Sequence, residues 1–291
     1  MFARNVCLVA AACGALTIEA LAQASPAVEV LLERVGERIE RYYRQAQNII
    51  FVEKSTVQPI EDNFGPSGFA RSTESELRIQ SSSDGDGSET ATVVRELLKV
   101  NGRAPREKDK KDSKSCVDSN PVSREPLSFL LPGHRENYSF TYAGFGKGKD
   151  ANALVIDYIL RDEGTPEFVE DPQGRKDCYR FSLPVTFRGR VLVDATSYEV
   201  LRIEQSLAAP ADLRVPRALQ RKHNLPDRMT VERYDITIRY KVIAFKDPEE
   251  EMLLPESIDT LDMYRGGLES HRRRQVFSEY RRFLTGGRVV K

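Results

Sequence analysis

The stretch AGFGKGKD, residues 143 to 150, has the glycines and lysine of a phosphate-binding loop but not their spacing. A P-loop has four residues between its glycines, and lysine and a hydroxyl residue follow directly, so that backbone N–H groups and the lysine surround the phosphates. Here Gly144 lies too close to Gly148, and Asp150 rather than Ser or Thr follows Lys149. We therefore interpret the stretch as a hairpin loop between two strands.

The histidines and serines form no recognisable catalytic or metal-binding motif. His134, His223 and His271 are far apart and lack the spacing of a motif such as HExxH. No serine lies in a GxSxG sequence, which is the nucleophile elbow of many hydrolases. Carboxylates are abundant and a catalytic pair among them stays open, but no spacing points to one. We therefore expect no enzyme activity, no metal site and no cofactor.

The cysteines predict one disulfide in the mature protein. Cys7 and Cys13 lie in the N-terminal leader, which leaves only Cys116 and Cys178. Two cysteines in an oxidising compartment can pair. The long loop between them would make the bond worth about 3 to 5 kcal/mol, because it restricts the unfolded chain. Two unpaired thiols are the alternative.

The first 24 residues match a secretory signal peptide. Arg4 gives the positive start, a short apolar run follows, and Ala22 and Ala24 are small residues of the kind that a signal peptidase recognises. We expect cleavage near Ala24 and a mature protein that is periplasmic or secreted. The alternative is a lipid on Cys13, although Ala10 stands where Leu, Val or Ile is usual. No later run has the ~18 to 20 apolar residues of a spanning helix, so the protein would be peripheral to a membrane at most.

The chain is electrically balanced, with 44 Lys and Arg against 44 Asp and Glu. A general nucleic-acid binder needs a net positive face, so we expect no nucleic acid as a partner. In the basic segment HRRRQ, residues 271 to 275, Arg272, Arg273 and Arg274 form a candidate basic patch. We interpret it as the charged surface of an edge strand. The alternative is a patch that meets acidic partners or lipid headgroups.

An amphipathic helix is the clearest element of the sequence. From Val28 to Ala46, apolar residues recur every three or four positions and charged residues fill the other side. β-branched and aromatic residues follow from Ile49 to Val57, which predicts the first strand.

Most of the remaining chain has the alternation of β-strands. In the hairpin FRGRVLVDATSYEVLRIEQSL, residues 187 to 207, apolar residues alternate with charged ones in both strands. Such alternation is typical of an antiparallel sheet with one buried face and one solvent-exposed face. Further strands are predicted at residues 73–80, 93–100, 138–142, 154–160, 179–185, 234–245, 257–264 and 271–283.

Four connecting segments lack strand patterning. The charged segment at about 103–122 predicts a flexible loop. Residues 125–131 predict a short helix ended by Pro-Gly, and residues 249–251 predict an exposed turn. The Pro- and Arg-rich segment at about 208–230 predicts a linker that could carry a short helix or cap the sheet. We find no repeat and no abrupt change of composition, so residues 25 to 291 predict one domain.

One arrangement accounts for the apolar faces of the predicted helix and of all the predicted strands. The fold class is α+β and mostly β, with a single curved antiparallel sheet wrapped over the N-terminal amphipathic helix.

Two short motifs resemble features of a known family. A G-x-V-x-V-D-x-x-T-like hairpin and a Leu-Pro lead-in to a later strand are carried by Gly189, Val191, Val193, Asp194, Ser197, Leu254 and Pro255. Together with the opening helix, they make roughly residues 27 to 285 similar to the periplasmic lipoprotein-carrier superfamily of the LolA, LolB and RseB type. The resemblance implies an unclosed half-barrel whose hollow side is covered by helices. The segments at 103–122 and 208–230 exceed a minimal carrier.

The resemblance implies an exported, non-enzymatic carrier or sensor that binds acyl chains or a lipoprotein in a hydrophobic cavity. An envelope protein would be a further partner of a sensor. The alternative is a cell-envelope scaffold or protein-interaction domain with a closed, packed core, and an enzyme is the third hypothesis. Candidates to line the cavity are the inward-facing strand positions, each of which is otherwise an ordinary core residue. They are Phe181, Leu183, Val191, Val193, Leu201, Ile203, Ile236, Ile238 and Tyr240.

Overall fold

The computed structural model describes residues 28–45, 49–83, 89–112, 127–162, 164–170, 179–246 and 249–282. The predicted signal peptide and the two cysteines of the predicted disulfide, Cys116 and Cys178, lie outside these residues. Within them, no helix is long and apolar enough to cross a membrane. The same residues hold no group of three or more side chains that could together bind a metal ion.

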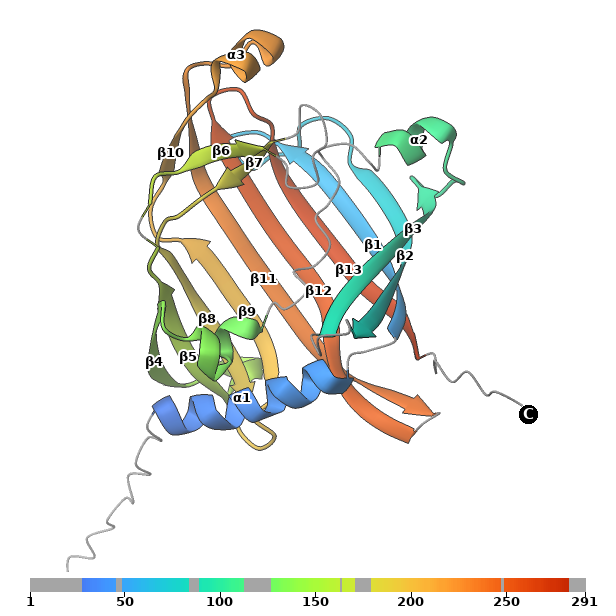
Figure 1. Cartoon of the computed structure of the whole chain (residues 1–291), viewed down its shortest axis with the longest axis vertical. Coiled ribbons are helices and arrows are strands. Elements are labelled where there is room, and N and C mark those ends of the chain that lie inside the picture. The colour runs from blue at the N-terminus through green and yellow to red at the C-terminus, as the bar shows by residue number, and fades with distance from the viewer. Residues whose placement is uncertain are drawn as a thin grey trace, which may run out of the picture.

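One 11-stranded antiparallel sheet forms most of the described protein (Figure 1). The strand order is β3-β2-β1-β13-β12-β11-β9-β8-β5-β4, and β10 pairs with β11 beside this path. The two end strands do not pair with each other, so the sheet is not closed, as expected for this mostly β fold. Its strands are β1 (Ile49–Ile60), β2 (Arg71–Ser83), β3 (Glu89–Val100), β4 (Tyr138–Phe145), β5 (Ala153–Leu160), β8 (Phe187–Asp194), β9 (Val200–Leu207), β10 (Ala211–Arg214), β11 (Arg228–Lys246), β12 (Glu249–Arg265) and β13 (Ser270–Arg282).

Helix α1 (Val28–Gln45) lies across one face of this sheet (Figure 1). Leu31, Leu32, Val35 and Ile39 are buried along a single stripe of the helix, as its amphipathic pattern predicts. The stripe packs against apolar side chains of β5, β8 and β9. We call the face that α1 covers the concave face, and the opposite one the outer face.

The segment that the sequence predicts as a flexible charged loop contains helix α2 (Glu107–Asp112). Asp109 accepts a hydrogen bond from the backbone N–H of Arg106 at 2.8 Å, and the Arg103 guanidinium contacts the same carboxylate at 2.7 Å. These contacts hold the pKa of the Asp109 carboxyl low, at about 2. The expectation of a loop is wrong for these residues, because a capping carboxylate stabilises a short helix. Residues 113–122 of the segment lie outside the described part.

Two other predicted elements differ from the structure. The strand predicted at 179–185 does not join the main sheet, since β7 (Tyr179–Ser182) pairs with β6 (Glu167–Glu170) in a separate two-stranded sheet. The turn predicted at 249–251 is wrong, because these residues begin β12, where Glu249 pairs with Lys246 of β11. Opposite charges facing each other favour such an extended hairpin.

The remaining connections each contain a short helix. The linker predicted at 208–230 carries β10 and helix α3 (Arg217–His223). The helix predicted at 125–131 is a 3-10 helix, η1 (Ser128–Leu130), followed by η2 (Pro132–His134). The loop AGFGKGKD contains the 3-10 helix η3 (Gly148–Asp150) between β4 and β5, which confirms a hairpin loop.

Candidate functional site

The cross-strand register arranges the concave side chains in rows. Val191 of β8 pairs with Ile203 of β9, Ile203 with Ile238 of β11, and Ile238 with Ile258 of β12. Directly opposed residues of antiparallel neighbours place their side chains on the same face. The next residue of the row is Gln275 of β13. The concave face therefore changes from apolar to polar between β12 and β13.

A small cavity lies between α1 and the apolar part of the sheet. Its volume is about 130 Å³, and apolar atoms of Ile39, Val200 and Leu253 contribute to its walls. Tyr42 also lines it, and burial raises the pKa of this phenol to about 12, so the hydroxyl stays neutral at physiological pH. The remaining lining residues are Leu127 of the segment before η1 and four charged residues, Arg38, Arg41, Glu199 and Glu251. A gap lined by both apolar and charged side chains thus lies directly beneath the helix.

Four of the predicted lining residues are packed directly under α1. Val191, Val193, Ile203 and Tyr240 are each 6% exposed or less and belong to the same buried cluster as the helix stripe. The Tyr240 hydroxyl is sealed from solvent and has no hydrogen-bond partner among the residues that the structure describes, and burial raises its pKa. In this arrangement the four side chains form core, and their contact with a ligand stays a prediction.

The other predicted lining residues lie elsewhere. Ile238 is half-buried and contacts both the buried cluster beneath α1 and a second cluster around β1, β12 and β13. Ile236 is half-buried against the second cluster only. Leu183 packs against a third cluster, formed around β10 and α3. Phe181 lies in β7, and its side chain is outside the described part. The structure therefore does not bring the predicted residues into one cavity.

Two β-bulges reverse orientations that simple alternation predicts. Val193 pairs with Val200 while the preceding residue of β8 already pairs with Arg202, so Leu201 is an extra residue of β9. Leu201 is 36% exposed and does not join the concave cluster, which corrects its predicted inward orientation. In β13, Glu279 has a φ of 53° at a second irregularity. An extra residue shifts the alternation by one position.

Buried polar side chains occupy the concave face on the β1 side. Glu53 is only 1% exposed, and Arg95 Nη1 lies 2.8 Å from its Oε2. The side-chain amide of Gln275 donates a hydrogen bond to the other carboxylate oxygen. Ser55 and Ser75, on β1 and β2, are buried beside this group. A charge withdrawn from water is tolerated here because it is both paired and hydrogen-bonded.

The candidate basic patch is divided between the two faces of the sheet. Arg272 and Arg274 are exposed, and Arg274 Nε lies 3.8 Å from a carboxylate oxygen of Asp259 on the outer face. Arg273 alternates with them and shares the concave face with Gln275, where its Nε is sealed from solvent. The three arginines therefore do not form one patch.

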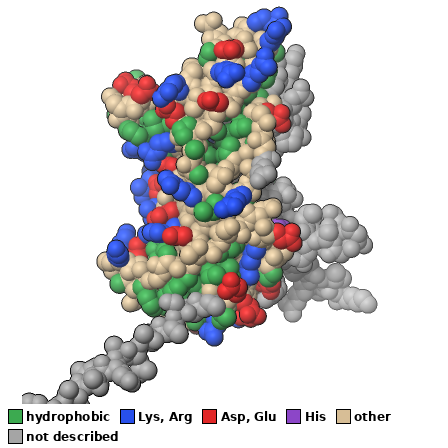
Figure 2. All heavy atoms as spheres, turned by 90° about the vertical axis from the view of Figure 1, so that its left-hand side faces the viewer, with side chains coloured by type: hydrophobic (Ala, Val, Ile, Leu, Met, Phe, Trp, Pro, Cys, Tyr) green, Lys and Arg blue, Asp and Glu red, His purple; other side chains and the backbone are tan. Residues whose placement is uncertain are grey.

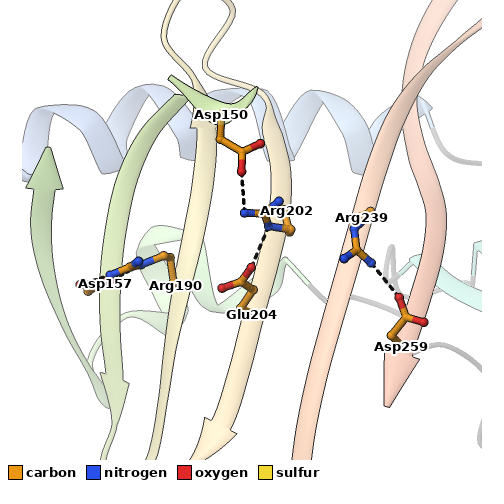
Figure 3. A network of polar contacts seen from close by, with 7 residues as sticks. All are labelled: Asp150, Asp157, Arg190, Arg202, Glu204, Arg239 and Asp259. Atoms are coloured by element: carbon orange, nitrogen blue, oxygen red, sulfur yellow. Dashed lines mark hydrogen bonds and ion pairs between the residues drawn. The ribbon is translucent and has the colours of Figure 1, made fainter. Parts of the chain in front are cut away.

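Opposite charges pair across the strands of the outer face (Figure 3). Arg190 Nε of β8 lies 2.7 Å from Asp157 of β5, and Arg239 Nη1 of β11 lies 2.7 Å from Asp259 of β12. Helix α1 lies behind the strands in this view, which confirms that the network is on the face opposite the helix.

The loop between β4 and β5 is tied to this network. Arg202 of β9 lies 2.8 Å from Asp150 of the loop and 2.8 Å from Glu204 (Figure 3). A Cβ on Gly146 would lie 2.2 Å from the Asp150 carbonyl oxygen, so this glycine permits the loop to close on itself. The glycines of AGFGKGKD therefore serve the turn.

A wide depression of about 810 Å³ lies on the outer face over β5, β8, β9 and β11. Its charged lining has both signs and comprises Asp157, Arg188, Arg190, Glu204, Glu232, Arg233 and Asp235. Figure 2, which views the molecule from the left-hand side of Figure 1, likewise shows acidic and basic side chains interspersed over the surface. The depression has no uniform charge that would select a small anion or cation.

The hairpin motif positions α1. Asp194 Oδ1 accepts hydrogen bonds from the backbone N–H groups of Thr196 and Ser197, at 2.9 and 2.8 Å, and these bonds lower the pKa of the carboxyl. The turn places Tyr198 against the helix, where its hydroxyl accepts a hydrogen bond from Arg34 Nη1 at 2.8 Å. The Arg34 guanidinium also lies 4.9 Å from the ring centre of the same tyrosine.

Sequence reasoning did not identify the polar residues of the concave face. Glu53, Asp262 and Gln275 each lie in a strand, and nothing in the adjacent sequence distinguishes them from exposed polar residues. A charged residue in phase with buried apolar neighbours of its strand is the signal that could have found Glu53, which shares its face with Phe51.

Comparison with known proteins gives one weak likeness. No family model and no curated protein matches the sequence. Among solved structures, a LolA superfamily protein from Nitrosomonas europaea aligns with a TM-score of 0.32 and 10% identity, covering 91% of this chain and 97% of that chain. At this TM-score the likeness carries no argument about function, which must be inferred from the concave face itself.

Proposed function

We propose that the protein is an exported, non-enzymatic carrier or sensor that binds acyl chains, free or attached to a lipoprotein, between α1 and the concave face. The observation that carries this proposal is the cavity of about 130 Å³ beneath α1. A gap beneath a helix that packs on an unclosed sheet through apolar side chains is a place that an acyl chain can enter.

The packing of α1 supports an exchange of apolar contacts. The helix contributes an apolar stripe to the core, and a buried Leu or Ile contributes roughly 1.5 to 3 kcal/mol. An acyl chain offers the same kind of surface, so it can replace part of this stripe without leaving the sheet exposed. Ile238, half-buried beside the cluster, extends the apolar surface along β11.

A second candidate function is that of an envelope scaffold or protein-interaction domain. The wide depression on the outer face favours it, because its polar and charged side chains could form the polar rim of a protein interface. In that function the core beneath α1 stays closed.

The two functions are separated by native mass spectrometry of the mature protein purified from an envelope fraction, followed by lipid extraction. Near-stoichiometric acyl lipid or lipopeptide supports the carrier. A clean apo mass together with no uptake of a fluorescent fatty acid contradicts it and favours the scaffold.

A matched pair of variants tests the location of the acyl chain. Ile238→Asp places a charge on the concave face. Thr237→Asp places the same charge at the preceding residue of β11, on the outer face. We expect the first variant to lose fatty-acid uptake about tenfold or more and the second to keep it. Equal uptake by both variants would exclude the concave face as the binding surface.

A further inference from the structure

An acid and a base on the concave face lie close together without pairing. Thr260 of β12 pairs with Arg273 of β13, and Asp262 pairs with His271, so Asp262 and Arg273 are diagonal neighbours on one face. Among the described residues, no salt bridge joins them, although the charge of Arg273 still acts on Asp262. Asp262 Oδ1 and Arg273 Nε are both sealed from solvent, and neither atom has a hydrogen-bond partner within the described part of the chain.

Other charged side chains of the sheet have partners of opposite charge. Three positions before Asp262 in the same strand, Asp259 pairs with Arg239 at 2.7 Å. On the concave face, Glu53 is held by Arg95 and Gln275. Buried polar atoms in folded proteins almost always have a partner, because their lost hydration is otherwise not offset. An unpartnered acceptor beside an unpartnered donor would therefore be stabilised by a group that pairs with both.

The opposite charges of Asp262 and Arg273 specify the chemistry of a group that could pair with both. Asp262 accepts hydrogen bonds and attracts a cation, and Arg273 donates them and attracts an anion. A simple anion would be repelled by the carboxylate, and a simple cation by the guanidinium. A group that carries an ammonium and a phosphate a few atoms apart satisfies both.

The neighbouring side chains place this site at the end of the apolar surface. Tyr234 of β11 faces Asp262, and Ile236 faces Thr260 in the adjacent row. Ile236 and Ile238 then continue along β11 toward the cluster beneath α1. An amphipathic ligand can therefore have its polar group at Asp262 and Arg273 while its chain follows these isoleucines.

We propose that Asp262 and Arg273 bind the zwitterionic headgroup of an acyl ligand, with the ammonium at Asp262 and the phosphate at Arg273. The position of the acyl chain rests on the proposed function, whereas the recognition of the headgroup does not. A phosphoethanolamine group matches this chemistry, and it can be part of a phospholipid or a free soluble molecule.

The test measures binding to the full mature chain by calorimetry, with probes below their micelle concentrations. The probes are lysophosphatidylethanolamine, lysophosphatidylglycerol and a fatty acid of the same chain length, together with soluble glycerophosphoethanolamine. We expect the ethanolamine lipid to bind about tenfold more tightly than the other two lipids, the difference that one or two charge-assisted hydrogen bonds supply. Measurable binding of the soluble headgroup would identify a free phosphoethanolamine as a second source.

Three variants assign the preference to the pair. Asp262→Asn and Arg273→Gln should each remove the tenfold preference for the ethanolamine lipid over the other two lipids. Asp259→Asn, on the outer face of the same strand, should keep the preference. If Arg273→Gln does not fold, Arg273→Lys keeps the charge but loses the planar fork, and it should weaken the preference.

Two outcomes overturn the proposal. All three lipids binding equally well would mean that the pair recognises no headgroup, although acyl binding would stand. A preference that persists in both Asp262→Asn and Arg273→Gln would place headgroup recognition elsewhere. If no lipid binds but the soluble headgroup does, the acyl-carrier function fails while the headgroup site stands.

Discussion

The ring of Tyr158 on β5 lies directly over Gly189 of β8, with which it pairs in the sheet. A Cβ at position 189 would come 2.3 Å from the tyrosine Cζ and 2.4 Å from the Glu204 carbonyl oxygen. The tyrosine hydroxyl passes over this glycine and donates a hydrogen bond to Gln205 Oε1 of β9 at 3.0 Å. The glycine of the hairpin motif is therefore required for a buried side chain to span three strands.

Gly189→Ala should destabilise the protein by about 3 kcal/mol, the upper end of the usual range for overpacking. The added methyl meets a ring and a backbone oxygen, and the backbone oxygen cannot turn away. Chemical denaturation measures the loss. Gly133→Ala is the matched control, because no heavy atom lies within 4 Å of an added Cβ there. Equal stabilities of the two variants would show that Tyr158 does not occupy the space above Gly189.

Arg95→Met should destabilise the protein by about 3 kcal/mol, because it leaves the Glu53 carboxylate buried without its cation. Adding Glu53→Gln to this variant should recover at least half of the loss, since the buried charge is then gone and an amide can still bond to Gln275. Arg190→Met breaks a pair whose side chains are 49% and 42% exposed and should cost less than about 1 kcal/mol. A double variant no more stable than Arg95→Met would mean that Arg95 contributes mainly by packing.

The stability of the protein should depend on pH through Asp262. Burial raises the pKa of this carboxyl above its ordinary value of 3.8, and the charges of Arg273 and His271 on β13 offset part of the effect. Asp235 of β11 raises the pKa further, and Tyr234 faces the carboxyl from the same strand. The folded state therefore binds more protons than the unfolded state between the ordinary and the raised pKa, so stability falls as pH rises through this window.

Asp262→Asn removes this dependence. Relative to wild type, the variant should gain stability as pH rises from about 3.8 upward, and the gain should level off once the folded-state carboxyl is ionised. Urea denaturation at a series of pH values gives the difference. Asp259→Asn, which breaks an ion pair with Arg239 on the outer face, should show no such gain. A wild-type protein more stable than Asp262→Asn at neutral pH would show that the carboxylate is paired after all.

The regular spacing of apolar residues along the sequence explains which helices and strands could be predicted. Helix α1 and the β8–β9 hairpin each repeat an apolar position often enough for the period to be visible along the chain alone. Strands β6 and β10 have four residues each, too few to establish alternation, and both were missed. Helix α2 was missed because its stability comes from the capping carboxylate of Asp109 in a segment without apolar residues.

The candidate site depends on register, which the sequence does not reveal. Arg273 belongs to a run of three arginines, and only the pairing of β13 with β12 turns it to the same face as Asp262. Which of the two faces is concave depends in turn on where α1 packs. Leu201 shows the same limit, since a single extra residue in β9 removes it from the face that alternation predicts.

Arg135→Ala should loosen α1 without unfolding the sheet. Arg135 Nη2 donates to the Leu32 carbonyl of α1 at 2.6 Å, and its Nε donates to the Leu130 carbonyl of η1 at 2.7 Å. The guanidinium approaches the helix at Gly36, where an added Cβ would lie 2.9 Å from it. One side chain thus ties the helix to the segment that borders the cavity, and its loss should cost about 2 kcal/mol.

Hydrogen exchange of the α1 amides measures this loosening, and stopped-flow uptake of a fluorescent fatty acid measures its consequence. Relative to the wild type, we expect hydrogen exchange of Arg135→Ala to become faster in α1 but to change little in β11 and β12. Uptake of the fatty acid should also become faster, because the helix must open before the acyl chain can enter. His134→Ala alters the exposed neighbouring residue and should change both rates little. Faster α1 exchange with unchanged uptake would mean that the acyl chain does not enter beneath the helix, and the concave face would then have to be reached from the open edge of the sheet.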